Sequence, residues 1–275
     1  MDPHGGAGPS GQELVRRANA TARGEAASIA RELRAGGEAA WSAPTACAGW
    51  TARDVVAHLI LGAEVFVTYT QAQLEGRSSP PVTPAARAER QAALRARPDE
   101  ALLDDLERLT DEFARLLEAQ PAAVLERPVP LPFGQFPLAW MSFGRVNELA
   151  LHHWDLRAPR EPDARVSAAA LPFIVPATFQ AVSLLAQGER QDGVWQLEIP
   201  DVATEPQSLR VASGQVSVAP GASADATCTL RLDGDALVRL LWGRLDLARA
   251  IDTGRVQVVG DRAHALALQR LFPGI

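Results

Sequence analysis

Residues 144–155 read Gly144-Arg-Val-Asn-Glu-Leu-Ala-Leu-His-His-Trp-Asp155, a stretch that places a glutamate four residues before a histidine. In a helix, Glu148 and His152 lie one turn apart on the same face. A carboxylate and an imidazole placed in this way can bind a divalent metal as a pair, but they need a third ligand from elsewhere in the chain. The spacing therefore predicts a helix that carries part of a metal site.

His58 is the best candidate for the third ligand. It lies near the start of a second predicted helix, in the stretch Gly49-Trp-Thr-Ala-Arg-Asp-Val-Val-Ala-His-Leu59. Three protein ligands with an open fourth position are typical of a reactive metal site rather than a structural one. Spacing alone leaves two simpler interpretations open. His58 could be a hydrogen-bonded core residue, and Glu148 could be a solvated helix charge.

Two further residues follow the predicted ligand pair. Asp155 lies one turn after His152, where it could accept the free N–H of a metal-binding imidazole or act as a general base. A hydrogen bond at the helix C-terminus or between domains is the competing interpretation. His153 points about 100° away from His152 on a helix, so we interpret it as a pocket-lining or surface residue.

Helical patterns surround these stretches and indicate a bundle. Thr51 is a predicted N-cap, with Asp54 three residues later in a capping box. The segment from Pro121 to Pro137 is interpreted as an ordered loop of the kind that can cover a site. Metal sites in bundles are built from side chains on facing helices, which suits the three candidate ligands. Four main helices are expected, at about 11–40, 52–74, 99–120 and 138–156.

After residue 162 the pattern changes to short alternating segments. A helix interrupted by prolines is expected at 168–187, and Ser213-Gly214 is a predicted hairpin turn. The fold class is therefore α+β, with a four-helix bundle followed by a smaller α+β domain. The predicted boundaries are a flexible tail at 1–10, the bundle at 11–160 and the second domain at 165–275. Strands are expected at 194–199, 208–212, 215–218, 227–232 and 256–259, with short helices at 235–241 and 263–271.

Composition narrows the classes of function. The formal net charge of −6 disfavours a nucleic-acid partner. All 27 basic residues are arginine, which excludes Schiff-base lysine chemistry. Neither an uninterrupted apolar run of about 18 residues nor a signal peptide is present, so we expect a cytoplasmic protein without a membrane partner. Of the two cysteines, Cys228 has no assigned role, and Cys47 is interpreted as a small residue in a tight turn rather than a reactive thiol.

Two motifs resemble those of a known family, the mycothiol-dependent maleylpyruvate isomerases. Residues 47–59, Cys47-Ala-Gly-Trp-Thr-Ala-Arg-Asp-Val-Val-Ala-His58-Leu, resemble the family pattern CPGW-T-x-x-D-x-x-x-HL, with Ala48 in place of the usual proline. Residues 147–155 resemble its second pattern, E-x-x-x-H-x-x-D. The stretch Leu240-Leu-Trp-Gly-Arg-Leu-Asp246 is similar to the family's C-terminal domain, which is like sterol carrier proteins. The resemblance implies a DinB/YfiT-like metal-binding bundle in the N-terminal half.

The resemblance also implies a site and a chemistry. Its metal ligands correspond to His58, Glu148 and His152, with zinc or another divalent metal expected. Mycothiol, a low-molecular-weight thiol, would be the cosubstrate, and its thiolate would add to an electrophilic small molecule. Either cis–trans isomerisation or S-transfer would follow. Arg244 and Arg255 are candidates for binding the carboxylates of thiol or substrate, although either could form a structural ion pair.

Two other functions stay open from the sequence. One is a small-molecule or lipid-binding protein in which the metal is structural, since the C-terminal half resembles lipid carriers. The other is a hydrolase that uses a zinc-bound hydroxide. The expected oligomeric state is a monomer or a homodimer.

Overall fold

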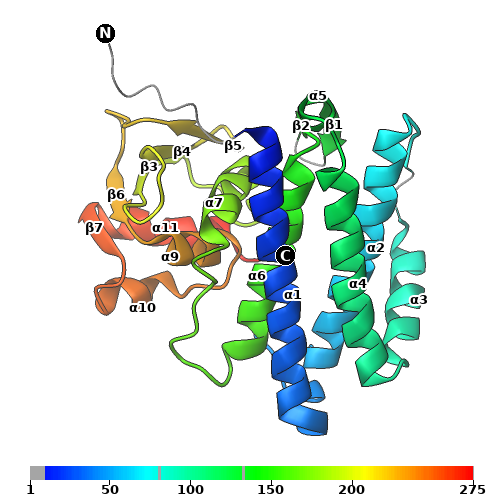
Figure 1. The fold of residues 1–275 in the computed structure, drawn as a ribbon. Coiled ribbons are helices and arrows are strands. Elements are labelled where there is room, and N and C mark those ends of the chain that lie inside the picture. Colours follow the sequence, from blue (N-terminus) through cyan, green and yellow to red (C-terminus); the bar gives the residue numbers. More distant parts are fainter. Residues whose placement is uncertain (1–9, 80–81, 132–133, 275) are drawn as a thin grey trace, which may run out of the picture. The chain divides into compact units, whose positions relative to one another are not determined.

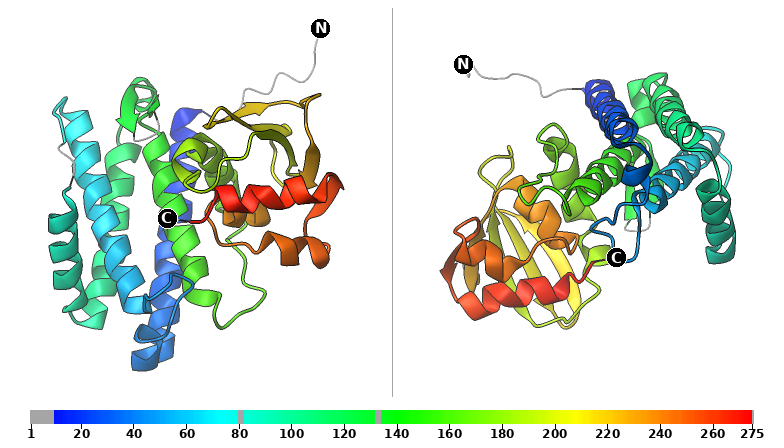
Figure 2. Two further views of the ribbon diagram at one scale, coloured as in Figure 1. Left: turned by 180° about the vertical axis from the view of Figure 1, so that it is seen from behind. Right: turned by 90° about the horizontal axis from the view of Figure 1, so that it is seen from below.

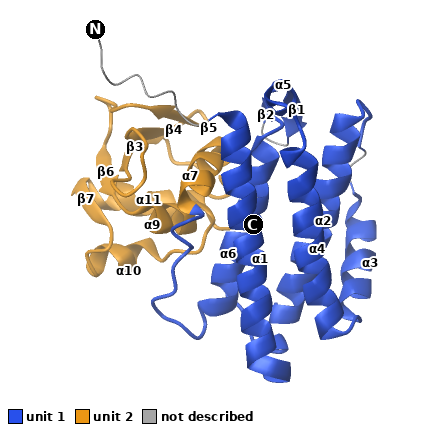
Figure 3. Ribbon diagram, in the orientation of Figure 1, with its two compact units in different colours: residues 1–170 blue, residues 171–275 orange. Residues whose placement is uncertain are grey.

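The computed structural model describes residues 10–79, 82–131 and 134–274. The chain divides into two compact units, residues 1–170 and 171–275 (Figure 3). Of the tail predicted at 1–10, residues 1–9 lie outside the described residues. Ser10 is the N-cap of the first helix, and its side chain accepts a hydrogen bond from the backbone of Glu13.

Four long helices form the first unit, as predicted (Figure 1). Both α1 and α2 pack against α4 and α6, so the four helices close into a ring. The shorter helix α3 (Pro84–Arg95) packs against α2. Figure 2 shows the bundle from behind and along its axis. The four bundle helices are α1 (Gly11–Trp41), α2 (Ala52–Leu74), α4 (Asp99–Glu118) and α6 (Trp140–Arg157).

Helix α2 carries the start of the site and has a well-defined beginning. Thr51 and Asp54 form the predicted capping box, and the backbone N–H of Thr51 donates to Asp54 Oδ2 at 2.8 Å. The helix is long and apolar enough to span a membrane, but 56% of its most apolar window is buried inside the protein. Packing in the bundle accounts for this apolar character, because core helices of soluble proteins pass the same test.

The segment interpreted as a loop over a site has a different structure. It contains a short helix, α5 (Ala122–Leu125), and an antiparallel pair of strands, β1 (Pro128–Leu131) and β2 (Gly134–Pro137). Leu125 and Val129 are buried in a hydrophobic cluster with Val67 and Met141. This cluster lies toward the end of α2 and the beginning of α6, more than two helical turns from His58 and His152. The segment therefore closes the opposite end of the bundle and does not cover the candidate ligands.

The second unit is a mixed sheet with helices, which confirms the predicted α+β fold class. Its five strands run in the order β5-β4-β3-β6-β7, and all neighbours are antiparallel except β3 and β6. The turn at Ser213-Gly214 joins β4 to β5, and both residues have positive φ angles of 50° and 75°. The strands are β3 (Gly193–Glu198), β4 (Gln207–Ala212), β5 (Gln215–Pro220), β6 (Cys228–Arg231) and β7 (Gln257–Gly260).

The helices of the second unit fit the sequence pattern except in two places. The helix predicted at 168–187 is divided at Ala181 into two short pieces, with Pro176 inside the first of them, and a helix at 247–252 was missed. Its residues are too few to show a helical period. The helices are α7 (Leu171–Gln180), α8 (Val182–Leu185), α9 (Gly234–Leu241), α10 (Leu247–Asp252) and α11 (Arg262–Leu271).

Candidate metal centre

The structure brings His58, Glu148 and His152 together where α2 packs against α6. One possible ligand atom from each lies within 4.8 Å of the others. Nε2 of His58 is 3.3 Å from Oε2 of Glu148, and the ring centroids of His58 and His152 are 4.8 Å apart. The three side chains are 26%, 29% and 12% exposed, so the cluster is reachable from solvent. The residues that sequence spacing selected therefore converge on one point.

Glu148 is ionised at neutral pH in this arrangement. Burial alone would raise the pKa of Glu148, but other interactions outweigh it and lower the pKa to about 2. These are the hydrogen bond with His58 and the charges of His152, His58 and Arg145. A carboxylate that keeps its negative charge is a suitable ligand for a divalent cation.

Asp155 fixes the orientation of the His152 ring. Its side chain is completely buried, and Oδ2 lies 2.9 Å from Nδ1 of His152. A hydrogen bond donated by Nδ1 to this oxygen would leave the lone pair on Nε2, which is the tautomer that a metal ligand needs. Of the predicted alternatives for Asp155, the geometry matches the acceptor of the imidazole N–H.

Arg145 is part of the site, although the sequence pattern did not single it out. Its side chain is completely buried, with Nη1 donating to Leu59 O at 3.0 Å and Nη2 donating to Thr110 Oγ1 at 2.8 Å. Burial lowers the pKa of Arg145 to about 10, against the opposing effect of the Glu148 charge. The guanidinium is thus a cation at neutral pH, and it ties α6 to α2 and α4 beside the ligands. The sequence offered one signal for this role, since Arg145 lies one helical turn before Glu148.

Trp50 forms an aromatic wall beside the two imidazoles. The centroid of its ring is 5.2 Å from that of His58 and 6.5 Å from that of His152, and it is nearly parallel to the latter at 16°. It follows the turn that precedes α2. In the sequence, Trp50 was notable only as part of the first motif. Its contact with His152, about a hundred positions later, leaves no local sequence pattern.

Comparisons with known proteins divide the chain between two families. The family described as "Mycothiol maleylpyruvate isomerase N-terminal domain" matches residues 22–157, which contain all three candidate ligands. The "SCP-2 sterol transfer family" matches residues 178–273. This chain belongs to the mycothiol-dependent maleylpyruvate isomerase family.

Two solved structures have the same fold over most of both chains. A mycothiol-dependent maleylpyruvate isomerase is 19% identical with a TM-score of 0.61, and the match covers 84% of this chain and 90% of that one. A histidine-to-alanine mutant of such an isomerase is 18% identical with a TM-score of 0.62, covering 89% and 92%. A comparison with curated protein sequences found no match.

In this member of the mycothiol-dependent maleylpyruvate isomerase family, His153 is neither pocket lining nor surface, and that prediction was wrong. It is only 8% exposed and lies between two glutamates of α1. Nδ1 is 2.6 Å from Glu25 Oε2, and Nε2 is 2.9 Å from Glu32 Oε1. Burial would lower the pKa of His153, but the two carboxylates outweigh it and raise the pKa. His153 therefore braces α6 against α1.

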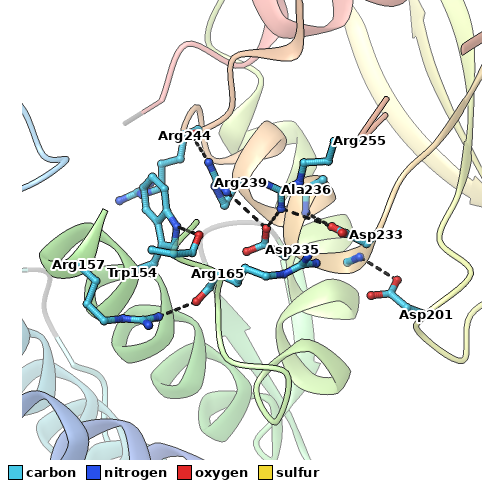
Figure 4. Close-up of polar contacts among 12 residues, drawn as sticks. Trp154, Arg157, Arg165, Asp201, Asp233, Asp235, Ala236, Arg239, Arg244 and Arg255 are labelled. Atoms are coloured by element: carbon cyan, nitrogen blue, oxygen red, sulfur yellow. Dashed lines mark hydrogen bonds and ion pairs between the residues drawn. The ribbon is translucent and has the colours of Figure 1, made fainter. Parts of the chain in front are cut away.

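The two predicted carboxylate-binding arginines both lie in the second unit (Figure 4). Arg255 pairs with Asp235, which is completely buried, and its Nη2 lies 3.7 Å from Asp233 Oδ1. Arg239 shares Asp235 at 3.4 Å. Nη1 of Arg244 donates to the carbonyl of Trp242 at 3.0 Å. Arg255 thus takes part in an ion-pair cluster, which matches the alternative interpretation of this residue as part of a structural ion pair.

Proposed function

We propose that this chain is a metal- and thiol-dependent enzyme that adds the thiolate of mycothiol to an electrophilic small molecule. Either cis–trans isomerisation or S-transfer completes the reaction. The observation that carries the proposal is the convergence of His58, Glu148 and His152 within 4.8 Å, inside the domain that matches the family. The names of the solved relatives, mycothiol-dependent maleylpyruvate isomerases, supply the choice of thiol.

The donor set fits a divalent metal, with zinc as the expected ion. Two imidazoles and one carboxylate form a ligand set that catalytic zinc sites use. Glu148 is ionised, and the contact with Asp155 leaves Nε2 of His152 its lone pair. A zinc ion held by these residues would supply the positive charge that favours a bound thiolate over a thiol at neutral pH.

The other residues act on the ligands and on the space beside them. Asp155 holds the Nδ1 proton of His152 and keeps that ring in one orientation. Because its side chain is completely buried, Asp155 acts through His152 rather than on a bound molecule. Arg145 offsets the charge of Glu148 from inside the bundle. Trp50 shields one side of the two imidazoles from water and offers an apolar surface to the substrate.

The remaining features of the proposal rest on the sequence. Arg244 and Arg255 are proposed to bind carboxylates of the thiol or the substrate, in competition with the contacts that they make within the second unit. The partners are the thiol and the electrophile, and the net charge of −6 disfavours nucleic acid. A cytoplasmic location, the absence of a membrane partner and a monomeric or homodimeric state remain predictions.

Metal content and thiol dependence test the proposal together. The purified chain is expected to contain about one zinc per molecule, and to convert maleylpyruvate, as the probe electrophile, only when mycothiol is present. His58→Ala and Glu148→Gln should lose the metal. Glu64→Gln is the matched control, because Glu64 also lies on α2 but pairs with Arg90. An unchanged metal content in His58→Ala would contradict the site.

One observation favours a second function, which is binding of an apolar ligand. Residues 178–273 match a sterol transfer family, so the second unit could hold a lipid while the metal is structural. Native mass spectrometry of the purified chain distinguishes the two functions, since a retained lipid supports the carrier and a mycothiol adduct supports the enzyme. Turnover that survives complete removal of low-molecular-weight thiols would instead support the zinc-hydroxide hydrolase.

A further inference from the structure

The buried carboxylate of Asp155 has a second donor besides His152. Sγ of Cys47 lies 3.2 Å from Asp155 Oδ2, the same oxygen that accepts from Nδ1 of His152 at 2.9 Å. Because Asp155 is 0% exposed, bulk water does not reach this oxygen and the protein must supply its donors. The thiol of Cys47 therefore supplies a hydrogen bond that a more exposed carboxylate would take from solvent.

The turn before α2 holds Cys47 in place for this contact. The backbone N–H of Cys47 donates to Thr45 Oγ1 at 3.2 Å, and its carbonyl accepts from Trp50 N–H at 3.0 Å. The neighbouring N–H of Ala46 donates to the carbonyl oxygen of Asp155 at 2.9 Å. The turn thus binds Asp155 twice, once through its main chain and once through its side chain. Such a double attachment fixes the position of the thiol relative to the carboxylate.

The thiol acts on His152 through Asp155 and not directly. Sγ is 3.8 Å from Nδ1 of His152, which is longer than its 3.2 Å to Asp155 Oδ2. A thiol that donates to a carboxylate has to keep its proton, whereas a nucleophilic or metal-binding cysteine has to lose it. The contacts thus form a chain from Cys47 to Asp155 to His152, in which each partner restricts the orientation of the next.

We propose that Cys47 is a positioning residue for the metal centre, which it orders by donating to the Asp155 oxygen that holds His152. The inference rests on the proposed metal site and adds an outer partner to it. The sequence interpretation of Cys47 as a small residue in a tight turn explains its backbone but not its side chain. A second possibility is that Cys47, His152 and Asp155 hold a cation themselves, since they also form a three-donor group. Zinc affinity and the cobalt(II) spectrum of the Cys47 variants separate the two.

The test compares metal binding by the full chain with that of Cys47→Ala and Cys47→Ser. Zinc affinity is measured by competition with a chromophoric chelator, and the site symmetry is followed through the visible absorption of bound cobalt(II). Cys47→Ala should weaken zinc binding by about 10-fold, at the lower end of the range for outer partners of metal ligands. Its cobalt(II) spectrum should also change. Cys47→Ser, which keeps a donor, should restore most of the affinity and the wild-type spectrum.

Two controls connect the effect to Asp155. Cys228→Ala removes the other cysteine, which is 3% exposed in the second unit, and should leave zinc affinity unchanged. In an Asp155→Asn background, Cys47→Ala should cause little further loss, because both substitutions break the same chain of contacts. Full additivity of the two losses would contradict the inference.

Three other results would also overturn the inference. Unchanged affinity and spectrum in Cys47→Ala would show that the thiol does not position His152. A Cys47→Ser variant as weak as Cys47→Ala would show that volume rather than hydrogen bonding matters. A sulfur-to-cobalt charge-transfer band in the wild type that disappears in Cys47→Ala would make Cys47 a ligand. If the wild type itself binds no metal, the proposed function fails as well, which distinguishes that case from the others.

Discussion

His152 and His153 are neighbours in the chain, but they build two different regions of the first unit. His152 faces His58 of α2, and one of its ring nitrogens contacts the carboxylate of Asp155 on its own helix. His153 faces α1, where both of its ring nitrogens contact carboxylates, those of Glu25 and Glu32. One carboxylate leaves an imidazole with a lone pair that can bind a metal. Two carboxylates favour the doubly protonated cation, which has no lone pair to offer. The number of carboxylates that contact each imidazole therefore distinguishes His152 in the candidate metal centre from His153, which holds α6 against α1.

The largest expected effect removes a ligand from the His152 region. Glu148→Gln keeps the size of the side chain but loses its charge, so metal affinity should fall by more than about 100-fold, beyond the range for an outer partner. In the metal-free protein the free energy of unfolding should also fall, because the substitution removes the charge that His58, His152 and Arg145 stabilise when they lower the pKa of Glu148 to about 2. Chelator competition and urea unfolding measure the two quantities. If Glu148→Gln lost much stability but kept its metal affinity, the His152 region would be structural rather than metal-binding.

The converse substitution breaks the brace. His153→Ala leaves Glu25, which is 6% exposed, without its partner, and should destabilise the protein by about 3 kcal/mol. Metal affinity should change little, since His153 is not among the candidate ligands. Urea unfolding of the metal-free protein gives the free energy, and zinc titration under native conditions provides the control. The comparison fails if His153→Ala releases the metal but leaves stability unchanged.

A smaller effect is expected at the carboxylate that leaves His152 its lone pair. Asp155→Asn preserves the shape but weakens the hold on Nδ1, so zinc affinity should fall by about 10- to 100-fold. Asp111→Asn, on the surface of α4 where Asp111 pairs with Arg23, is the matched control. Equal zinc affinity in Asp155→Asn and the wild type would show that the orientation of His152 does not depend on this contact.

The most gradual effect is a pH dependence of the brace. The folded-state pKa of His153 is raised above its ordinary value of 6.5, so its contribution is fully present below about pH 6.5 and is lost as the pH rises through the raised pKa. The pKa of Glu32 is lowered: burial opposes this shift, and the hydrogen bond from His153 drives it. That contribution is lost at acidic pH. The stability difference between wild type and His153→Ala should thus shrink above neutral pH, by at most about 1.4 kcal/mol per pH unit. A difference that grows as the pH rises above neutral would contradict this role of His153.

The sequence predicted the His152 region better than the His153 region for a physical reason. The i, i+4 spacing of Glu148 and His152 reports a shared helix face, and His58 could be added because its helix was recognisable. Helical spacing also shows that His153 points elsewhere, but it cannot reveal which helix lies on that side. The partners Glu25 and Glu32 are 128 and 121 residues away.

The same limit applies to the turn and to the proline-rich segment. The contact of Cys47 with Asp155 depends on how the turn before α2 packs against α6. A local sequence motif contains no information about this packing. Prolines at 128, 130 and 137 argued against strands because proline lacks an N–H donor. The strand pair β1–β2 forms nevertheless, with Pro128 opposite Pro137 and Pro130 opposite Gln135.

The wall formed by Trp50 gives the site an optical reporter of its own. An indole so close to two candidate ligand rings should lose fluorescence when a paramagnetic ion such as copper(II) binds between them. The chain has six tryptophans, so the difference between wild type and Trp50→Phe isolates the signal of this one. Occupancy of the centre could then be followed in real time without a label.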